Sequence, residues 1–239
     1  MNIVLLHPDD WIADGVVLLR DQRAVHIRTV LRAQLGDTLR VGELGGQCGQ
    51  GRIEALDTAG VRLQVQLHDA PPSRHRLDIV LALPRPKMLR RILRQCAEFG
   101  VNHLHLIHSA RVEKSYWQSP LLQPQRLQEA LQAGMERSRD TVAPLVHLHR
   151  RFRPFVEDQL PELCGGRPCW IADMGAPLTL AQADPGPAVV MIGPEGGFVP
   201  FEVQLAEAMQ ARRISLGERI LSVDTALITV LAQAHRPPG

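Results

Sequence analysis

The chain has 239 residues, of which 45% are hydrophobic, and its formal net charge is only +2. This length is sufficient for one large domain or two small ones with their own cores. No apolar run is long enough to span a membrane, and the N-terminus lacks the basic start and cleavage site of a signal peptide. We therefore expect a soluble, cytoplasmic protein with no membrane partner. The four cysteines form no Cys-x-x-Cys pair, so reduced thiols are expected.

The charge is distributed unevenly along the chain. Between Ser73 and Arg153 there are 15 Lys and Arg against 6 Asp and Glu, a balance of +9. This leaves 12 of the 27 basic and 19 of the 25 acidic residues for the rest of the chain, a balance of −7. Such asymmetry is typical of a surface that binds a polyanion, although an arginine-rich surface facing only solvent would have the same composition.

Residues 1–70 are predicted to form a small β-barrel domain. Short strands with glycine turns are typical of such barrels. The expected strands are residues 3–6, 38–41, 50–56 and 61–67, with turns at 35–37 and 45–46 and one short helix at 25–35. Pro71 and Pro72 resist both helix and central strand, so they mark a linker to a second domain, residues 74–239.

The second domain is predicted to be α/β with a mainly parallel sheet, because strands alternate with helices. The expected strands are 77–83, 101–108, 146–152 and 169–172, and the expected helices are 87–99 and 126–139. In the first helix Lys87, Arg90, Arg91 and Arg94 gather on the face opposite the apolar residues. We predict that they contact RNA phosphates; a solvated helix face is the alternative.

The strand at 101–108 places His103 and His105 on the same side. A His-x-His pair on a strand can bind a metal ion, but no third ligand follows at a spacing that would complete a site. We therefore predict no metal.

The C-terminal part contains two strand–loop–helix units in tandem. An apolar strand at 188–192 stops at Gly193 and a helix begins after Phe198; a strand at 213–216, a turn at 217–219 and a helix at 222–234 follow. Such units place both loops at one end of a parallel sheet, where ligands bind. The glycines let backbone N–H groups approach a ligand closely. Two ordinary tight turns are the alternative, and neither Gly-x-Gly-x-x-Gly nor a Walker lysine is present.

Both loops resemble motifs of a known family. Ile192-Gly-Pro-Glu-Gly-Gly-Phe198, followed by Leu216-Gly-Glu-Arg-Ile-Leu-Ser-Val-Asp-Thr-Ala226, is similar to the paired signature of the SPOUT-class RNA methyltransferases. The closest resemblance is to the family that methylates N3 of a uridine in 16S ribosomal RNA. It implies a PUA-like N-terminal barrel, a C-terminal domain with a deep trefoil knot, S-adenosylmethionine as cofactor, a homodimer, and 16S ribosomal RNA or the small ribosomal subunit as substrate.

The resemblance also implies the site residues. The cofactor pocket would be lined by Ile192, Gly193, Pro194, Glu195, Gly196, Leu216, Gly217, Ile220, Leu221, Ser222, Thr225 and Ala226. RNA-binding residues beyond the basic helix would be Arg32, Arg137 and Arg139.

Methylation at N3 requires that the N3 proton leave and that charge on the uracil carbonyl oxygens be stabilised. Arg219 is the candidate for stabilising this charge, and Glu195 or Asp224 for accepting the proton or orienting the arginine. The alternatives are a solvent-facing turn for Arg219, a helix cap for Asp224 and a backbone-bonding loop acid for Glu195.

The chain departs from the family pattern at several polar positions. Ser222 stands where the family usually has arginine, Asp224 where it has glutamate, and Cys96 where it has lysine. Asp140 replaces an arginine, which would reverse the charge at an expected RNA-facing position.

Two interpretations follow from these departures. The first is an active methyltransferase in which other arginines compensate; the second is a divergent RNA-binding relative that has lost methyl transfer or changed its target. A third interpretation, a nucleotide-binding regulator that does not bind RNA, would leave the excess of basic residues in the middle of the chain unexplained.

Overall fold

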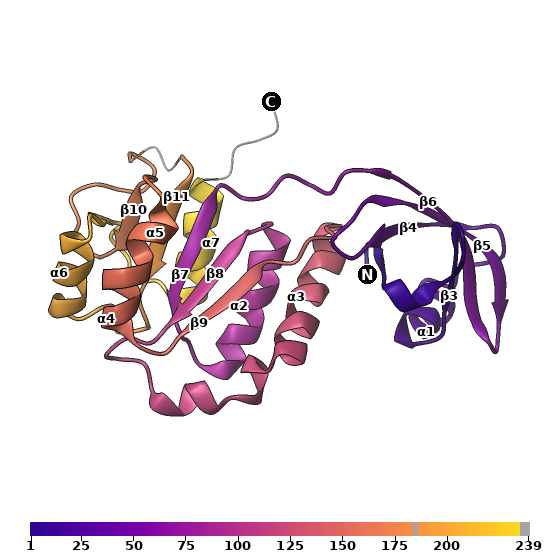
Figure 1. Ribbon diagram of the computed structural model, residues 1–239, viewed down its shortest axis with the longest axis horizontal. Coiled ribbons are helices and arrows are strands. Elements are labelled where there is room, and N and C mark those ends of the chain that lie inside the picture. The colour runs from indigo at the N-terminus through magenta and orange to yellow at the C-terminus, as the bar shows by residue number, and fades with distance from the viewer. Residues whose placement is uncertain (184–185, 235–239) are drawn as a thin grey trace. The chain divides into compact units, whose positions relative to one another are not determined.

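The computed structural model describes residues 1–183 and 186–234. They divide into two compact units, Met1–Ser73 with Gln132–Ala143, and Arg74–Leu131 with the described residues that follow Ala143 (Figure 1). The sequence alone predicts residues 132–143 to lie in the second domain. They belong to the first unit because Asn2 N–H donates to the Glu136 carbonyl at 2.9 Å and the Thr141 hydroxyl donates to the Gly46 carbonyl at 2.6 Å.

The first unit is built on a six-stranded sheet of barrel-like form, as predicted. Its strand order is β1-β4-β5-β6-β3-β2, with β1 parallel to β4 and the other pairs antiparallel. The strands are β1 (Val4–Leu6), β2 (Trp11–Ala13), β3 (Val16–Leu19), β4 (Thr38–Glu43), β5 (Cys48–Asp57) and β6 (Gly60–Asp69). Buried side chains such as Leu6, Leu19, Val41 and Leu63 form its core.

The helix of the first unit is displaced from its predicted position. The sequence analysis expected residues 25–35, whereas α1 spans Gln22–Thr29. It begins earlier because the Asp21 carboxylate caps it by accepting from Arg23 N–H at 2.9 Å. It ends earlier because Arg32 adopts a left-handed conformation, with φ of 51°. Strands β2 and β3 were not predicted.

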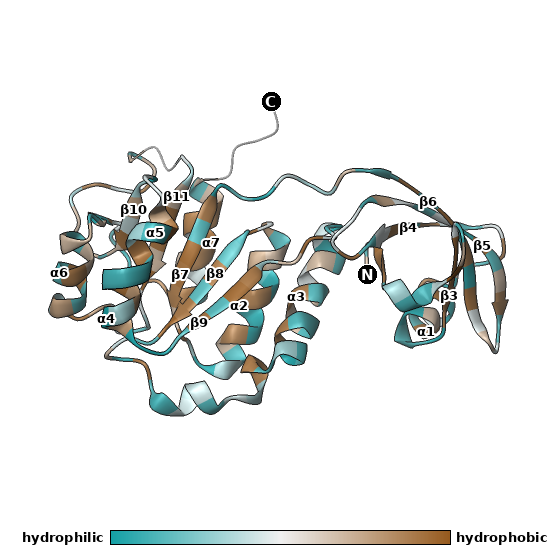
Figure 2. Ribbon diagram, in the orientation of Figure 1, coloured by the Kyte–Doolittle hydropathy of each residue, from teal (hydrophilic) through white to brown (hydrophobic). Residues whose placement is uncertain are grey.

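The second unit contains a six-stranded sheet in the order β12-β10-β11-β7-β8-β9, and every neighbouring pair is parallel. This confirms the predicted α/β class with a parallel sheet. The strands are β7 (Leu77–Ala82), β8 (His103–Ile107), β9 (Leu145–His149), β10 (Cys169–Ala172), β11 (Ala188–Ile192) and β12 (Arg212–Ile214). All residues of the central strands β7 and β11 are buried, and β7 is strongly hydrophobic (Figure 2).

Helices cover both faces of this sheet (Figure 1). They are α2 (Pro86–Glu98), α4 (Phe152–Pro154), α5 (Leu160–Cys164), α6 (Pro200–Ala208) and α7 (Val223–Gln233). Helix α3 (Pro124–Ser138) begins in this unit and ends in the first. Helix α7 packs on β11 and α2, and α5 contacts β11. Two 3₁₀ turns, Lys114–Gln118 and Pro120–Leu122, precede α3.

Several predicted strands extend beyond the observed ones, namely 101–108 against β8, 146–152 against β9 and 213–216 against β12. Strand β9 ends at His149 and not at Phe152, because Phe152 begins α4. A π-helical turn, Phe155–Gln159, continues α4 into α5 and buries Phe155. Among the described residues no helix is long and apolar enough to cross a membrane.

Candidate functional site

The loops that follow β10, β11 and β12 enclose a pocket of about 420 Å³ at the carboxyl edge of the parallel sheet. This volume lies within the usual range for small-molecule sites, about 300–1,000 Å³. A larger hollow of about 930 Å³ lies at the other edge, beside Cys169 and Arg212. Because open parallel sheets bind ligands beyond the carboxyl ends of their strands, the smaller pocket is the candidate.

Glycines are required by the shape of both loops. A Cβ on Gly193 would lie 3.0 Å from Phe198 N and 3.1 Å from Gly197 C, since the loop folds back over this residue. Gly217 has φ of +121°, which other residues rarely adopt, and a Cβ there would meet open space. The Arg111 guanidinium donates to the Gly196 carbonyl and holds the first loop in place.

Most of the residues expected to bind the cofactor line this pocket. These are Ile192, Gly193, Pro194, Glu195, Gly196, Leu216, Gly217, Ile220, Leu221 and Ala226, together with Arg219. Ser222 and Thr225 are not in the lining; their hydroxyl oxygens are 2.8 Å apart at the start of α7. Ala172, Asp173, Met174, Gly197 and Phe198 also line the pocket and were not predicted to do so, whereas Val223 lies within the expected segment 220–226. Asp173 directly follows a strand that was predicted correctly. Its position at the carboxyl end of that strand could have indicated that it lines the ligand site.

The pocket combines two carboxylates with one guanidinium. Asp173 Oδ2 lies 3.0 Å from an Arg213 nitrogen, and Glu195 Oε1 lies 3.3 Å from Arg85 Nε. Arg219 is exposed and has no hydrogen-bond or ion-pair partner in the part of the chain that the structure describes. Its charge is therefore available to a ligand, whereas both carboxylates are already oriented.

Asp224 lies outside the pocket lining. The Ser222 hydroxyl donates to its Oδ1 at 2.6 Å, and an Arg91 nitrogen lies 2.8 Å from its Oδ2. The Ser222 hydrogen bond, followed by the one from Arg91, lowers the pKa of the Asp224 carboxyl. Its lowered pKa makes the Asp224 carboxylate a poor proton acceptor. Its bonds to Ser222 and Arg91 instead join the start of α7 to α2.

The four cations of α2 are exposed opposite a buried apolar face. Leu89, Ile92, Leu93, Cys96 and Ala97 form that buried face, and Lys87, Arg90, Arg91 and Arg94 the exposed one. Arg91 is partly used by Asp224. Arg32, Arg137 and Arg139, also exposed, belong to the first unit.

Two departures from the family pattern are interior positions. Cys96 is fully buried, and Asp140 is only 3% exposed, with its carboxylate accepting from Val142 N–H at 3.0 Å. The expectation that Asp140 reverses charge on an RNA-facing surface was therefore wrong. Its side chain stabilises the turn after α3.

A second, smaller hollow adjoins the pocket. Its volume is about 270 Å³, and it shares Pro194, Glu195 and Gly196 with the pocket. Arg85, Arg111 and Tyr116 line its other side. The sequence analysis did not single out these three residues, which follow strands β7 and β8. The loop at 193–198 thus separates two adjacent cavities.

Glu202 of α6 fastens this loop to the rest of the unit. It is 3% exposed, and its carboxylate accepts from Ala110 N–H at 2.7 Å and Val199 N–H at 3.0 Å.

We expect Glu202→Ala to lower the free energy of unfolding by about 2–4 kcal/mol, since two bonds to a charged group are lost. Urea unfolding would measure it. Glu207→Ala, on the same helix but in an exposed ion pair with Arg213, is the control and should cost less than about 1 kcal/mol. Equal losses would contradict this role of Glu202.

The chain is similar to RNA methyltransferases in sequence. The family model described as an RNA methyltransferase domain matches residues 71–235. The ribosomal RNA small subunit methyltransferase E of Treponema pallidum is 31% identical over 98% of this chain and 92% of its own length.

Solved structures share the fold across the whole chain. A putative methyltransferase from Legionella pneumophila, solved in complex with bound cofactor SAM, has a TM-score of 0.75 at 20% identity, covering 97% of this chain and 95% of its own. The ribosomal RNA small subunit methyltransferase E of Neisseria gonorrhoeae, solved bound to S-adenosyl methionine, has a TM-score of 0.73 at 22% identity, covering 98% and 95%.

Proposed function

This chain belongs to the RNA methyltransferase family that includes the ribosomal RNA small subunit methyltransferases E, and we propose that it methylates N3 of a uridine in 16S ribosomal RNA with S-adenosylmethionine as methyl donor. The observation that carries this proposal is the pocket in which both glycine loops meet beside the unpaired Arg219.

The pocket residues fit S-adenosylmethionine chemically. The cofactor supplies an activated methyl group on a sulfonium, and it also carries an ammonium group and an adenine ring. Ile192, Leu216 and Leu221 offer apolar contact for the ring, and the backbone of 193–197 offers polar groups. The carboxylate of Asp173 offers negative charge for a cationic group of the cofactor. A mixed lining of this kind suits an amphipathic cation.

Arg219 and Glu195 are the residues we assign to the reaction. The uridine N3 nitrogen becomes a nucleophile only when its proton leaves and the charge on the neighbouring carbonyl oxygens is stabilised. The Arg219 guanidinium would stabilise that charge, and the Glu195 carboxylate, oriented by Arg85, would accept the proton. Asp224 would only hold the start of α7 in position and would take no part in the proton transfer. The adjoining hollow beside Arg111 and Tyr116 is the candidate place for the target nucleotide.

The proposal includes the RNA surface and the assembly. The exposed cations of α2, with Arg32, Arg137 and Arg139, would bind ribosomal RNA phosphates, and the enzyme would act as a homodimer in the cytoplasm. A PUA-like first domain, residues 1–70, would help to hold the RNA. We also propose a deep trefoil knot in the C-terminal part of the second unit. The ground for the knot is the resemblance of the loops at 192–198 and 216–226 to the paired motifs of this class of methyltransferase.

Calorimetric titration of the purified chain with S-adenosylmethionine tests the cofactor site. We expect micromolar affinity, and we expect Gly217→Val to weaken it by about tenfold or more, equivalent to about 1.4 kcal/mol. The valine would occupy the open space at the pocket and strain a backbone with φ of +121°. Gly45→Val is the matched control, since Gly45 also has positive φ and open surroundings but lies in the first unit. No binding by the folded wild-type chain would overturn the proposal.

Methyl transfer to unmodified small subunits then tests the reaction. Digestion of the RNA and mass spectrometry should identify 3-methyluridine as the product. A methyl group on another atom would exclude the N3 assignment. Cofactor binding without any transfer, to subunits or to free RNA, would favour the divergent relative that binds RNA without this activity.

A further inference from the structure

Four histidines gather on one face of the sheet, on the two strands at its β9 edge. Strands β8 and β9 pair in parallel with His105 opposite His147. Because side chains alternate along a strand, His103, His105, His147 and His149 project from the same face. Spacing along the chain offered no third ligand beside the His103 and His105 pair. Pairing with a strand 44 residues away supplies one.

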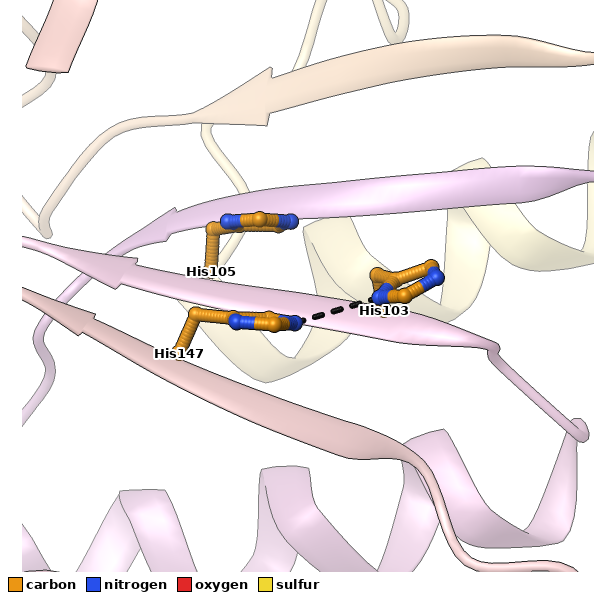
Figure 3. Close-up of side chains that lie close together, drawn as sticks. All are labelled: His103, His105 and His147. Carbon is orange, nitrogen blue, oxygen red and sulfur yellow. Dashed lines mark hydrogen bonds between the residues drawn. The ribbon is translucent and has the colours of Figure 1, made fainter. Parts of the chain in front are cut away.

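Three of these side chains converge (Figure 3). One ring nitrogen of each of His103, His105 and His147 lies within 4.8 Å of the others. His103 Nδ1 is 3.1 Å from His147 Nε2, and the rings of His105 and His147 stack with centroids 4.4 Å apart. Two nitrogen ligands on a tetrahedral zinc ion, each about 2.0–2.1 Å from the metal, are roughly 3.3 Å apart. The His103 and His147 nitrogens are therefore at the separation of two ligands on one ion, and a ring nitrogen of His105 lies within 4.8 Å of both.

His105 has the hydrogen bonding of a metal ligand. It is 7% exposed, its Nδ1 lies 3.0 Å from His149 Nε2, and its own Nε2 is buried without a hydrogen-bond partner among the described residues. In the tautomer protonated at Nδ1, His105 donates to His149 and its Nε2 presents a lone pair. An unpaired buried nitrogen is unfavourable, and a metal ion would satisfy it. Metal-binding histidines usually have their other N–H held by a neighbour in this way.

We propose that His103, His105 and His147 bind a late first-row divalent metal ion, most simply Zn²⁺, which fastens the edge strand β9 to β8. A set of imidazoles suits Zn²⁺, Ni²⁺ or Cu²⁺ and does not suit Mg²⁺ or Ca²⁺. His103 and His147 are only half-buried, so the ion can enter from solvent. Three ligands leave a fourth coordination position for water. His149 is a positioning residue that orients His105.

Zinc titration of the full-length chain, stripped with a chelator, tests this site. We expect one ion per chain with submicromolar affinity by competition with a chromogenic chelator, and a higher melting temperature with Zn²⁺. Co²⁺ in place of Zn²⁺ should give the visible absorption of a four-coordinate ion. His105→Gln and His147→Gln should each weaken binding more than about 100-fold, and His149→Gln by about 10- to 100-fold, as expected for a residue behind a ligand.

His68→Gln is the matched control, because His68 is exposed in the first unit and should leave zinc affinity unchanged. If His105→Gln fails to fold, His147→Gln on the half-buried edge strand decides the question. Absence of zinc binding by the folded wild-type chain would overturn the proposal. Binding that neither His105→Gln nor His147→Gln weakens would also overturn it. Since neither RNA nor methyl donor is used, the outcome is independent of the proposed methyl transfer.

Discussion

Replacing Arg219 with alanine should lower kcat for methyl transfer by about 10²–10³-fold, the effect of removing one donor that stabilises developing charge. Affinity for S-adenosylmethionine should change by no more than a few-fold. We expect a large effect on kcat and a small one on cofactor affinity because of where Arg219 lies. It lines the pocket but has no ion-pair partner among the described residues, so its charge is available for the uracil ring that reacts. Multiple-turnover transfer at saturating cofactor and small subunits measures kcat.

Two further variants distinguish the loss of the Arg219 charge from a general effect of removing an arginine. Arg219→Lys keeps the charge but not the planar fork, and it should retain part of the lost rate. Arg212→Ala removes an exposed arginine outside this pocket and should leave kcat unchanged. A kcat of Arg219→Ala within a few-fold of wild type would assign charge stabilisation to another cation, with Arg85 or Arg111 as the next candidates.

The parts that could be predicted from sequence are those whose signal is local. The buried strand at 188–192 was predicted within its observed bounds because its apolar run ends at a glycine. Gly193 and Gly217 were singled out for backbone reasons; the structure gives Gly193 a steric cause and Gly217 a conformational one, its φ of +121°. The amphipathic helix α2 also follows from spacing alone, because its buried and exposed residues alternate with helical period.

What could not be predicted depends on interactions between distant segments. The bond between Arg91 and Asp224 joins residues 133 apart, so no spacing rule connects them. Asp140 was interpreted as a surface charge, but its carboxylate is turned to the backbone of Val142. The third histidine beside His103 and His105 comes from strand pairing, which the single sequence leaves open.

The second prediction with a large effect concerns the cations of α2. We expect the triple variant Lys87→Gln, Arg90→Gln and Arg94→Gln to weaken binding to ribosomal RNA on the order of 100-fold at low salt. The slope of log affinity against log salt should fall by about 3, close to one for each phosphate that the variant no longer neutralises. Arg91 is left intact because its bond to Asp224 supports α7, so the variant tests binding to RNA and not the packing of the helix. Filter binding at several salt concentrations measures both quantities.

A control with the same change in net charge decides whether position matters. Arg126, Arg153 and Arg212 are exposed and lie off α2, so replacing them with glutamine removes three charges elsewhere in the same unit. If the α2 cations touch phosphates, the control should lose far less affinity and keep most of its salt slope, because counterion release follows direct neutralisation of phosphates. Equal losses of affinity in both triple variants would mean that RNA responds to the overall field of a basic chain and not to this helix. The polar face of α2 would then be a solvated surface, which was the alternative interpretation of its sequence.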